Sequence, residues 1–215
     1  KADGKKIPGL VTILVGEDPA SNVYVNMKHK ACAEVGMNSR ADRFEADMLE
    51  EDLLNLVNKY NNDDDYHGIL VQLQLPKHIN EDAIIEAISP NKDVDGFHPI
   101  NVGKMMIGKE TLYPCTPHGV VELLKRYKIE TKGKHVVVVG RSNIVGKPVA
   151  NMLLQKKEGA NAIVTVVHSA AEDLASITKQ ADILIVAIGV PEFIKADMVK
   201  EDVVIIDVGV KRVED

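Results

Sequence analysis

Apolar residues along the chain form short runs typical of buried strands, and these runs alternate with stretches whose apolar spacing is typical of helices. In the first half, the strand-like runs lie at 10–15 and 67–73, and the helical stretches lie at 19–35, 50–60 and 81–88. In the second half, strands are predicted at about 135–139, 162–168, 183–188 and 203–208, with helices between the first three. Strands that alternate with helices indicate parallel sheets, so the pattern predicts an α/β protein.

Capping residues mark the starts of two helices. Asp18-Pro19 and Thr116-Pro117 each place a side-chain acceptor before a proline, which is favoured at the first helical position. Gly36 is predicted to end the first of these helices in a left-handed conformation. An apolar stripe at fourfold spacing is predicted to pack that helix on the sheet: Val23, Met27, Ala31 and Val35.

The stretch 89–113 lacks periodicity and is too long for an ordinary connector, so it is predicted to be functional or to hold structure that the pattern does not reveal. The 215 residues suffice for two domains. We place the change of domain at the helix that follows this stretch, which divides the chain into residues 1–116 and 117–215. Each domain is predicted to hold its own parallel sheet.

Composition narrows the classes of partner. The net charge is −6, with 26 basic against 32 acidic residues and no basic block, which disfavours nucleic acid because phosphate backbones need a clustered positive face. No apolar run approaches the roughly 20 residues that span a bilayer. Cys32 and Cys115 are too few for a disulfide framework and lack metal-site spacing. A cytoplasmic protein without a metal is therefore predicted, and a targeting segment before Lys1 is compatible with the sequence.

The most specific local signal is the segment 135–148, in which a run of β-branched residues enters a tight turn and a helical pattern follows. This arrangement is typical of a dinucleotide-binding βαβ unit, where backbone N–H groups and the helix N-terminus receive a phosphate. The turn departs from the usual G-x-G-x-x-G. Ser142 replaces the second glycine, the last glycine comes one residue late at Gly146, and Pro148 falls within the expected helix.

Polar side chains are also predicted to gather at the carboxyl ends of the first strands. Tyr24 and Lys28 form an i, i+4 pair on the helix after the first strand. Gln72 ends the next strand, and Asp93 and Asp95 lie in the aperiodic stretch. Taken singly, these are a rim tyrosine, a snorkelling lysine, a sheet-end hydrogen-bonder and turn carboxylates. Taken together, they form a polar site for a small molecule, and spacing alone favours neither interpretation.

Six motifs, in order and spread over nearly the whole chain, provide a family resemblance. They are Ala20-Ser21-x-x-Tyr24-Val25-x-x-Lys28-x-Lys30-Ala31, Val71-Gln72-Leu73-x-Leu75-Pro76, Lys92-Asp93-Val94-Asp95-Gly96-Phe97, Cys115-Thr116-Pro117-x-Gly119, Gly140-Arg141-Ser142-x-x-Val145-Gly146-x-Pro148 and Ile206-Asp207-Val208-Gly209. With these motifs the chain resembles the bifunctional methylenetetrahydrofolate dehydrogenase/methenyltetrahydrofolate cyclohydrolases. The resemblance implies a subunit with folate between a substrate domain and a Rossmann-like NAD(P)-binding domain, usually in a homodimer.

The resemblance also implies roles for single residues. Lys28 is the implied catalytic lysine, Gln72 positions it, and Asp95 holds the pterin. The residues implied to bind folate are Tyr24, Lys28, Val71, Gln72, Leu73 and Asp95. Those implied to bind the cofactor are Gly140, Arg141, Ser142, Val145, Gly146, His168, Ser169 and Val210. The chemistry agrees, because an aromatic face suits a flat pterin, a carboxylate suits its paired N–H donors, and a lysine can shuttle protons.

NADP is favoured over NAD as the cofactor. NAD sites usually have an acidic residue at the end of the second strand, where this chain has His168-Ser169 and no carboxylate before Glu172. Arg141 and Ser169 can instead accept a ribose phosphate. Two features argue the other way: Arg141 could pair with a surface acid, and Ala170-Ala171 replaces the polar or basic pair often found there.

The sequence therefore predicts an enzyme of one-carbon metabolism that oxidises 5,10-methylenetetrahydrofolate with NADP and hydrolyses the methenyl product to 10-formyltetrahydrofolate. Two alternatives stay open: a dehydrogenase without the hydrolase, which the Tyr24-x-x-x-Lys28 pair disfavours, and a catalytically silent folate- or nucleotide-binding module. The sequence lacks the family's Pro-Gly-Gly-Val-Gly-Pro loop and last helix, so a truncated second domain is expected. Gln74 also replaces the proline usual in the strand-end motif.

Overall fold

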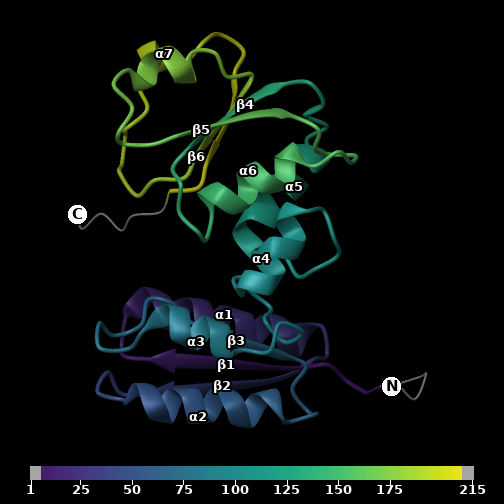
Figure 1. Ribbon diagram of the computed structural model, residues 1–215, viewed down its shortest axis with the longest axis vertical. Helices are drawn as coiled ribbons and strands as arrows, with labels where there is room; N and C mark the ends of the chain where they lie inside the picture. Colours follow the sequence, from purple (N-terminus) through teal and green to yellow (C-terminus); the bar gives the residue numbers. More distant parts are fainter. Residues whose placement is uncertain (1–5, 210–215) are drawn as a thin grey trace. The chain divides into compact units, whose positions relative to one another are not determined.

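A computed structural model describes residues 6–209. The chain divides into two compact units, Lys1–Asn101 and Val102–Asp215. Each unit has its own parallel sheet and its own core (Figure 1), which confirms the predicted α/β class. The boundary predicted after residue 116 stays a prediction, since the division into compact units comes earlier in the chain. No helix within the described range is long and apolar enough to cross a membrane.

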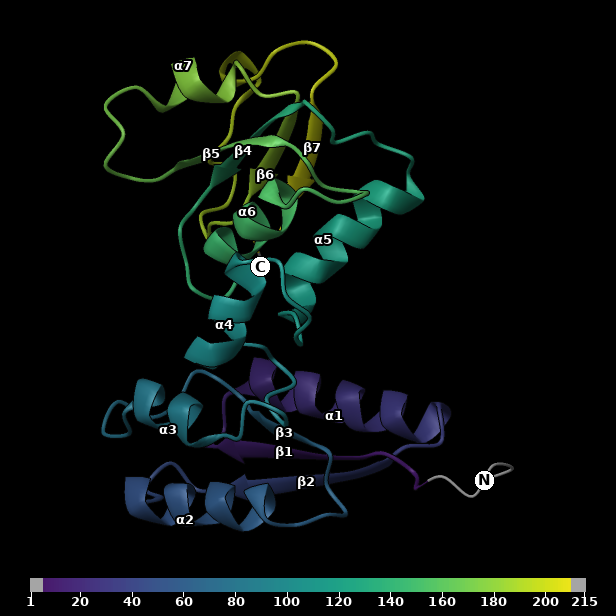
Figure 2. The ribbon, with the colours of Figure 1, turned by 45° about the vertical axis from the view of Figure 1, so that its right-hand side comes forward.

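The first unit holds a parallel sheet of three strands in the order β2-β1-β3. Its elements are β1 (Gly9–Val15), α1 (Pro19–Glu34), β2 (Asn38–Phe44), α2 (Glu50–Asn61), β3 (Gly68–Val71) and α3 (Glu81–Ala87), with α4 (Pro99–Met106) crossing the division between the units. Figures 1 and 2 both show α1 on one face of the sheet and α2 on the other. Val11 and Ile13 of β1 are buried in one core with Leu53 and Val57 of α2. Strand alternation therefore fixes which side chains of β1 face α2.

The second unit holds a parallel sheet of four strands in the order β5-β4-β6-β7. Its elements are α5 (Cys115–Arg126), β4 (His135–Val139), α6 (Gly146–Leu154), β5 (Ile163–Val167), α7 (Leu174–Thr178), β6 (Ile183–Val186), a 3₁₀ turn (Ala196–Met198) and β7 (Val204–Asp207). Val136 and Val138 lie in the core with α5 and α6 (Figure 2), whereas Val137 and Val139 lie in a second core that includes Leu174 of α7. Helices thus cover both faces, as in a Rossmann-like fold.

The strand order places the candidate sites in both units. In each sheet the first strand, β1 or β4, lies between the two strands that follow it. Open α/β sheets of this kind bind ligands outside the carboxyl ends of the strands, where the strand order reverses. Gln72 follows β3 beside β1, and Gly140 follows β4 beside β6. Both sequence-predicted sites therefore lie where this topology favours a ligand.

Helix starts confirm one capping prediction and correct the other. The Asp18 carboxylate accepts a hydrogen bond of 2.7 Å from the Ser21 N–H, and Pro19 is the first residue of α1. Gly36 follows the same helix with a φ of 76°, as predicted. The Thr116 cap is wrong: α5 begins at Cys115 with Pro114 at its cap and no side-chain cap bond. Pro117 is the third residue of α5, and a proline is tolerated in the first turn because the N–H group that it lacks would have no partner within the helix there.

The predicted packing face of α1 is also wrong. Val23, Met27 and Val35 are 56%, 61% and 73% exposed, and Ala31 is exposed as well. The buried positions of α1 are Ser21, Val25 and Cys32. Both faces of this helix contain apolar residues, so periodicity could not select the face that packs on the sheet. The correction matters for Lys28, which comes three residues after Val25 and four residues before Cys32. Lys28 therefore lies on the same side of α1 as the buried residues.

Strand β2 and helix α4 were not among the predicted elements. Strand β2 has the polar sequence Asn-Ser-Arg-Ala-Asp-Arg-Phe and pairs only with β1, at the edge of the sheet. Edge strands tolerate polar residues because one side of them faces solvent. Helix α4 lies within the aperiodic stretch 89–113, whose hidden structure is thereby confirmed.

Candidate active site and nucleotide site

The centre of the first candidate site is a hydrogen bond between two residues far apart in the sequence. The Lys28 ammonium Nζ donates to Oε1 of Gln72 at 3.0 Å. The amide of Gln72 is itself held, because its Nε2 donates to the Leu73 carbonyl at 2.8 Å. Gln72 is thus oriented with its oxygen toward the lysine, and the lysine is held by a neutral acceptor rather than by a carboxylate.

Asp95 lies within electrostatic reach of this pair. Burial raises the pKa of the Asp95 carboxyl to about 6, the positive charge of Lys28 offsets part of that rise, and the negative charge of Asp93 adds to it. Desolvation disfavours the charged form of a carboxylate, so the carboxyl changes its charge near neutral pH rather than in acid. A titratable group of this kind is typical of functional sites.

A small pocket brings together further residues of the predicted folate site. Val71 and Leu73 at the end of β3 line it together with Asp93, Asp95 and Phe97. Tyr24 lies one turn before Lys28 on α1, and its side chain is 49% exposed. Tyr24, Lys28, Gln72 and Asp95 therefore come from three segments of one compact unit. An aromatic face, an ammonium group, an amide and a carboxyl are thus available for one polar, flat ligand.

Asp93 is the residue that sequence reasoning underrated. Its turn role is confirmed by the bond from the Gly96 N–H. In addition, Asp93 is only 3% exposed, and its carboxylate accepts two further hydrogen bonds from the segment after Asp95. The Asp-x-x-Gly spacing to Gly96 was a local signal for the turn. Nothing in the sequence indicated that Asn101, eight residues further on, also donates to this carboxylate.

The turn after β4 is built for close backbone approach. Gly140 has a φ of 118°, and a Cβ atom there would lie 2.4 Å from the Ala187 carbonyl oxygen after β6. A Cβ atom on Gly146 would lie 2.3 Å from the Gly140 carbonyl oxygen. Gly140 and Gly146, the two glycines predicted to bind the cofactor, thus let backbone segments approach more closely than a side chain at either position would allow.

Ser142 explains the unusual form of the motif. Its hydroxyl accepts hydrogen bonds from the N–H groups of Val145 at 3.1 Å and Gly146 at 3.2 Å, and its carbonyl accepts one from Lys147 at 3.0 Å. The first donors of α6 are therefore used by the turn itself. By contrast, the N–H groups of residues 141–144 form no hydrogen bond with any residue in 6–209. Within the described residues, the turn 141–144 rather than the first turn of α6 therefore offers unbonded N–H groups.

Arg141 is exposed and forms no ion pair with an acidic residue among residues 6–209. His168 and Ser169 directly follow β5, which pairs in parallel with β4. The ends of these two strands are joined by a hydrogen bond of 2.8 Å, which the Gly140 N–H donates to the Val167 carbonyl. The His168 Nδ1 accepts from the Ala170 N–H at 3.3 Å. Val210, the last predicted cofactor residue, lies outside the described residues.

Family models match both units. The catalytic-domain model of the tetrahydrofolate dehydrogenase/cyclohydrolases matches residues 1–95, and their NAD(P)-binding-domain model matches residues 114–215. The chain belongs to the tetrahydrofolate dehydrogenase/cyclohydrolase family. This confirms the resemblance found in the sequence motifs. A relative within the family, the bifunctional protein FolD of Bacillus subtilis (strain 168), is 58% identical over 207 residues, which are 96% of this chain and 72% of the relative.

Solved structures of the family have the same fold. The bifunctional enzyme FolD from Campylobacter jejuni superposes with a TM-score of 0.93 at 49% identity, over 99% of this chain and 74% of that chain. The Trypanosoma brucei dehydrogenase-cyclohydrolase, crystallised with NADP cofactor and an inhibitor, superposes with a TM-score of 0.90 at 39% identity, over 97% of this chain and 70% of that chain.

A substitution at Gly140 tests whether the turn after β4 needs a glycine for its fold and for nucleotide binding. Gly140→Ala should destabilise the protein by about 2–4 kcal/mol, because it combines a positive φ with a backbone clash, and it should weaken NADP binding. Urea unfolding and a nucleotide titration measure the two effects. Gly189→Ala is the matched control, since nothing lies within 4 Å of a Cβ atom there. Equal stability of the two variants would contradict the role given to Gly140.

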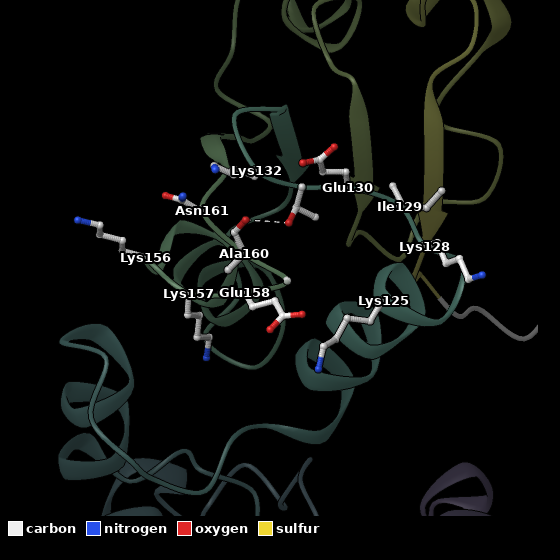
Figure 3. Close-up of a pocket in the computed structure, with 12 residues that line it drawn as sticks. Lys125, Lys128, Ile129, Glu130, Lys132, Lys156, Lys157, Glu158, Ala160 and Asn161 are labelled. Atoms are coloured by element: carbon white, nitrogen blue, oxygen red, sulfur yellow. Dashed lines mark hydrogen bonds between the residues drawn. The ribbon is translucent and has the colours of Figure 1, made fainter.

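One pocket of the second unit is lined by none of the residues predicted to bind folate or the nucleotide. It has a volume of about 520 Å³ and precedes β4 and β5, at the amino ends of these strands (Figure 3). Five lysines line it, and Figure 3 shows the Lys128 side chain pointing to one side of the pocket and those of Lys132 and Lys156 pointing to the other. The Thr131 hydroxyl donates to the Ala160 carbonyl at 2.8 Å and closes its floor. Because these charges do not converge, we assign no ligand to this surface.

Proposed function

We propose that this family member oxidises 5,10-methylenetetrahydrofolate with NADP and then hydrolyses the 5,10-methenyl product to 10-formyltetrahydrofolate. Oxidation removes a hydride from the methylene carbon and leaves a cationic methenyl carbon. Bound NADP supplies the hydride acceptor. Hydrolysis adds water to the cationic carbon, breaks one of its two carbon–nitrogen bonds and releases a proton.

The strongest support is the 3.0 Å hydrogen bond between Lys28 and Gln72, with the partly buried carboxyl of Asp95 within electrostatic reach of Lys28. In this proposal Lys28 moves protons to and from the water that adds to the methenyl carbon, which general acid–base catalysis requires of a group within hydrogen-bond reach. Gln72 orients Lys28 through a neutral oxygen, so the hydrogen-bond partner of the ammonium group carries no counter-charge. A carboxylate in its place would form an ion pair and hold the proton on the lysine.

Asp95 and Tyr24 are proposed to recognise the folate. The pterin ring presents adjacent N–H donors, and an ionised carboxylate offers two acceptor oxygens to them. The exposed ring of Tyr24 offers a face on which a flat heterocycle can stack. Val71 and Leu73 add apolar walls, since they line the same small pocket as Asp95.

The second unit fits a dinucleotide phosphate. The turn 141–144 presents N–H groups that bond to no other described residue, and Gly140 and Gly146 keep side chains out of the way. Backbone donors of this kind are a common way to hold phosphate. Arg141 adds a positive charge beside them, and Ser169 adds a hydroxyl. Together with Val145, His168 and Val210, these are the residues that we propose for NADP.

Arg141→Ala tests the preference for NADP. If Arg141 binds the ribose phosphate, its loss should raise the Michaelis constant for NADP strongly and that for NAD little. The expected loss of selectivity is about 1.5–3 kcal/mol, the size of one charge-assisted hydrogen bond, and it should shrink at high salt. Arg126→Ala on α5 is a matched control because that arginine side chain is 80% exposed.

Ser169→Asp should act in the same direction as Arg141→Ala, because a carboxylate repels the phosphate and accepts from a free ribose hydroxyl. If wild type prefers NAD, or if neither change alters the ratio of NADP to NAD activity, the proposed phosphate site does not exist. The assignment of folate to the first unit would survive that result.

We also propose that the protein is a cytoplasmic homodimer. Strand β5 lies at the edge of its sheet, with Ile163 63% and Val166 40% exposed, which supports a protein contact along this edge. Within residues 6–209 no disulfide joins Cys32 and Cys115, which is compatible with a reducing compartment.

Hydrolysis of methenyltetrahydrofolate without nucleotide tests the second activity by itself. The complete natural reading frame that contains these residues should clear the methenyl absorbance faster than buffer does. A protein that oxidises methylenetetrahydrofolate but leaves the methenyl compound intact would be a monofunctional dehydrogenase. One that binds folate and performs neither reaction would be a silent binding module.

A further inference from the structure

We propose that Asp93 is a positioning residue for the folate site, which shapes the turn that presents Asp95 and sets the electrostatic environment of the Asp95 carboxyl. The inference rests on the proposed function, because it takes Asp95 as the group that binds the pterin. Asp93 itself is buried and is not proposed to touch the substrate.

Both oxygens of the Asp93 carboxylate are used by the segment that follows it. One accepts from the Gly96 N–H at 3.0 Å. The other accepts from the His98 N–H at 2.9 Å and from the Asn101 side-chain amide at 2.9 Å. Asp95 lies inside the loop that these three bonds close. Its backbone position therefore depends on a carboxylate at 93, since only an acceptor with two oxygens can satisfy all three donors.

The other end of this loop is tied to the sheet and to α2. The Ile69 N–H of β3 donates to the Lys92 carbonyl at 2.8 Å, and Asp93 forms an isolated bridge with Ile69. The Lys92 ammonium donates to the carbonyls of Tyr60 at 2.9 Å and Asp63 at 2.7 Å, near the end of α2. The loop is therefore fixed to the strand that ends at Val71, just before Gln72. Asp93 links this fixed base to the turn at Asp95.

Asp93 also acts on Asp95 through its charge. Two charged groups influence the Asp95 carboxyl: Lys28 from α1, which lowers its pKa, and Asp93 from the same loop, which raises it. Removing the negative charge at 93 should therefore lower the pKa of Asp95. If folate binding needs the Asp95 carboxylate, the acidic limb of kcat/KM for the folate substrate should then move to lower pH.

Two substitutions separate geometry from charge. Asp93→Asn removes the negative charge and places an amide N–H group against N–H groups that now donate to the carboxylate, so the folate KM should rise about tenfold. The acidic limb of kcat/KM should move to lower pH. Asp93→Glu keeps the charge but changes the length of the side chain, so the folate KM should rise while the limb stays within its wild-type range. Neither change should alter the KM for NADP. Asp64→Asn, an exposed change on the same unit, is the matched control.

A double-mutant cycle with Asp95→Asn tests whether Asp93 acts through Asp95. If it does, Asp93→Asn should add little to the KM defect of Asp95→Asn, because the group it positions is already lost. Additive defects, an unmoved acidic limb or failure of both Asp93 variants to fold would overturn the inference and leave Asp93 a purely structural residue. If Asp95→Asn alone leaves folate binding intact, the proposed folate site is wrong. If Asp95→Asn weakens binding but Asp93→Asn does not, only the role of Asp93 is wrong.

Discussion

Lys28→Met should lower methenyl hydrolysis by at least about 100-fold, which is the usual contribution of a positioned acid–base group. The methionine is of similar length but cannot accept or donate a proton. Oxidation of methylenetetrahydrofolate should suffer less, because hydride transfer is direct and needs no proton carrier. Folate should still bind, since Tyr24 and Asp95 are intact. Steady-state assays of both reactions, with a folate titration, measure the three quantities.

Lys30→Met is the matched control on the same helix. The Lys30 side chain is 81% exposed and lies 3.9 Å from Glu34, so its loss should affect neither reaction. Exposed ion pairs of this kind contribute little to stability. If Lys28→Met reduces both activities equally with unchanged folding, Lys28 binds the substrate rather than moving protons. Full hydrolysis by the Lys28 variant would remove it from the mechanism.

Asp95→Asn should weaken folate and antifolate binding by about tenfold to 100-fold, the cost of one lost charged hydrogen bond of about 1.5–3 kcal/mol. NADP affinity should stay nearly unchanged, because the nucleotide residues lie in the other unit. Isothermal titration with each ligand separates the two effects. Intact folate affinity in this variant would move the pterin site away from Asp95.

The same substitution should stabilise the fold at neutral pH. The pKa of Asp95 is raised from its ordinary 3.8 to about 6 in the folded protein, so the stability contributed by the neutral carboxyl is fully present below pH 3.8 and is lost as the pH rises through 6. Asparagine avoids that loss, and we expect a gain of about 2 kcal/mol at pH 7.5 that disappears toward pH 4. Urea unfolding at both pH values measures it. A variant less stable at pH 7.5 would contradict the burial of a charge at this position.

The hydrophobic pattern predicted the strands that consist of continuous apolar residues. The valines of β4 are buried on both faces, and they indicated a central parallel strand directly. Asp18-Pro19 likewise predicted the start of α1, because a cap depends on residues only three positions apart. The motifs around Lys28, Gln72 and Asp95 identified residues that the first unit brings together.

Features that depend on tertiary contacts could not be predicted. The packing face of α1 is decided by its neighbours, because its sequence has apolar residues on both faces. Strand β2 is held by pairing with β1 rather than by its own hydrophobicity. The buried network of Asp93 includes the side chain of Asn101, and no local pattern links these two residues. The hydrogen bonds that Ser142 accepts from the first N–H groups of α6 were not predicted either, because the motif does not show how the turn folds back on the helix.

The most direct test follows one substrate through both reactions. The complete natural protein is mixed with 5,10-methylenetetrahydrofolate and NADP, and reduced nucleotide and 10-formyltetrahydrofolate are quantified together. We expect one 10-formyl product for each NADP reduced once the methenyl compound has turned over, whereas Lys28→Met should accumulate the methenyl compound. Reduced nucleotide with no 10-formyl product above the spontaneous rate in the wild type, or no reduced nucleotide at all, would contradict a bifunctional dehydrogenase and cyclohydrolase.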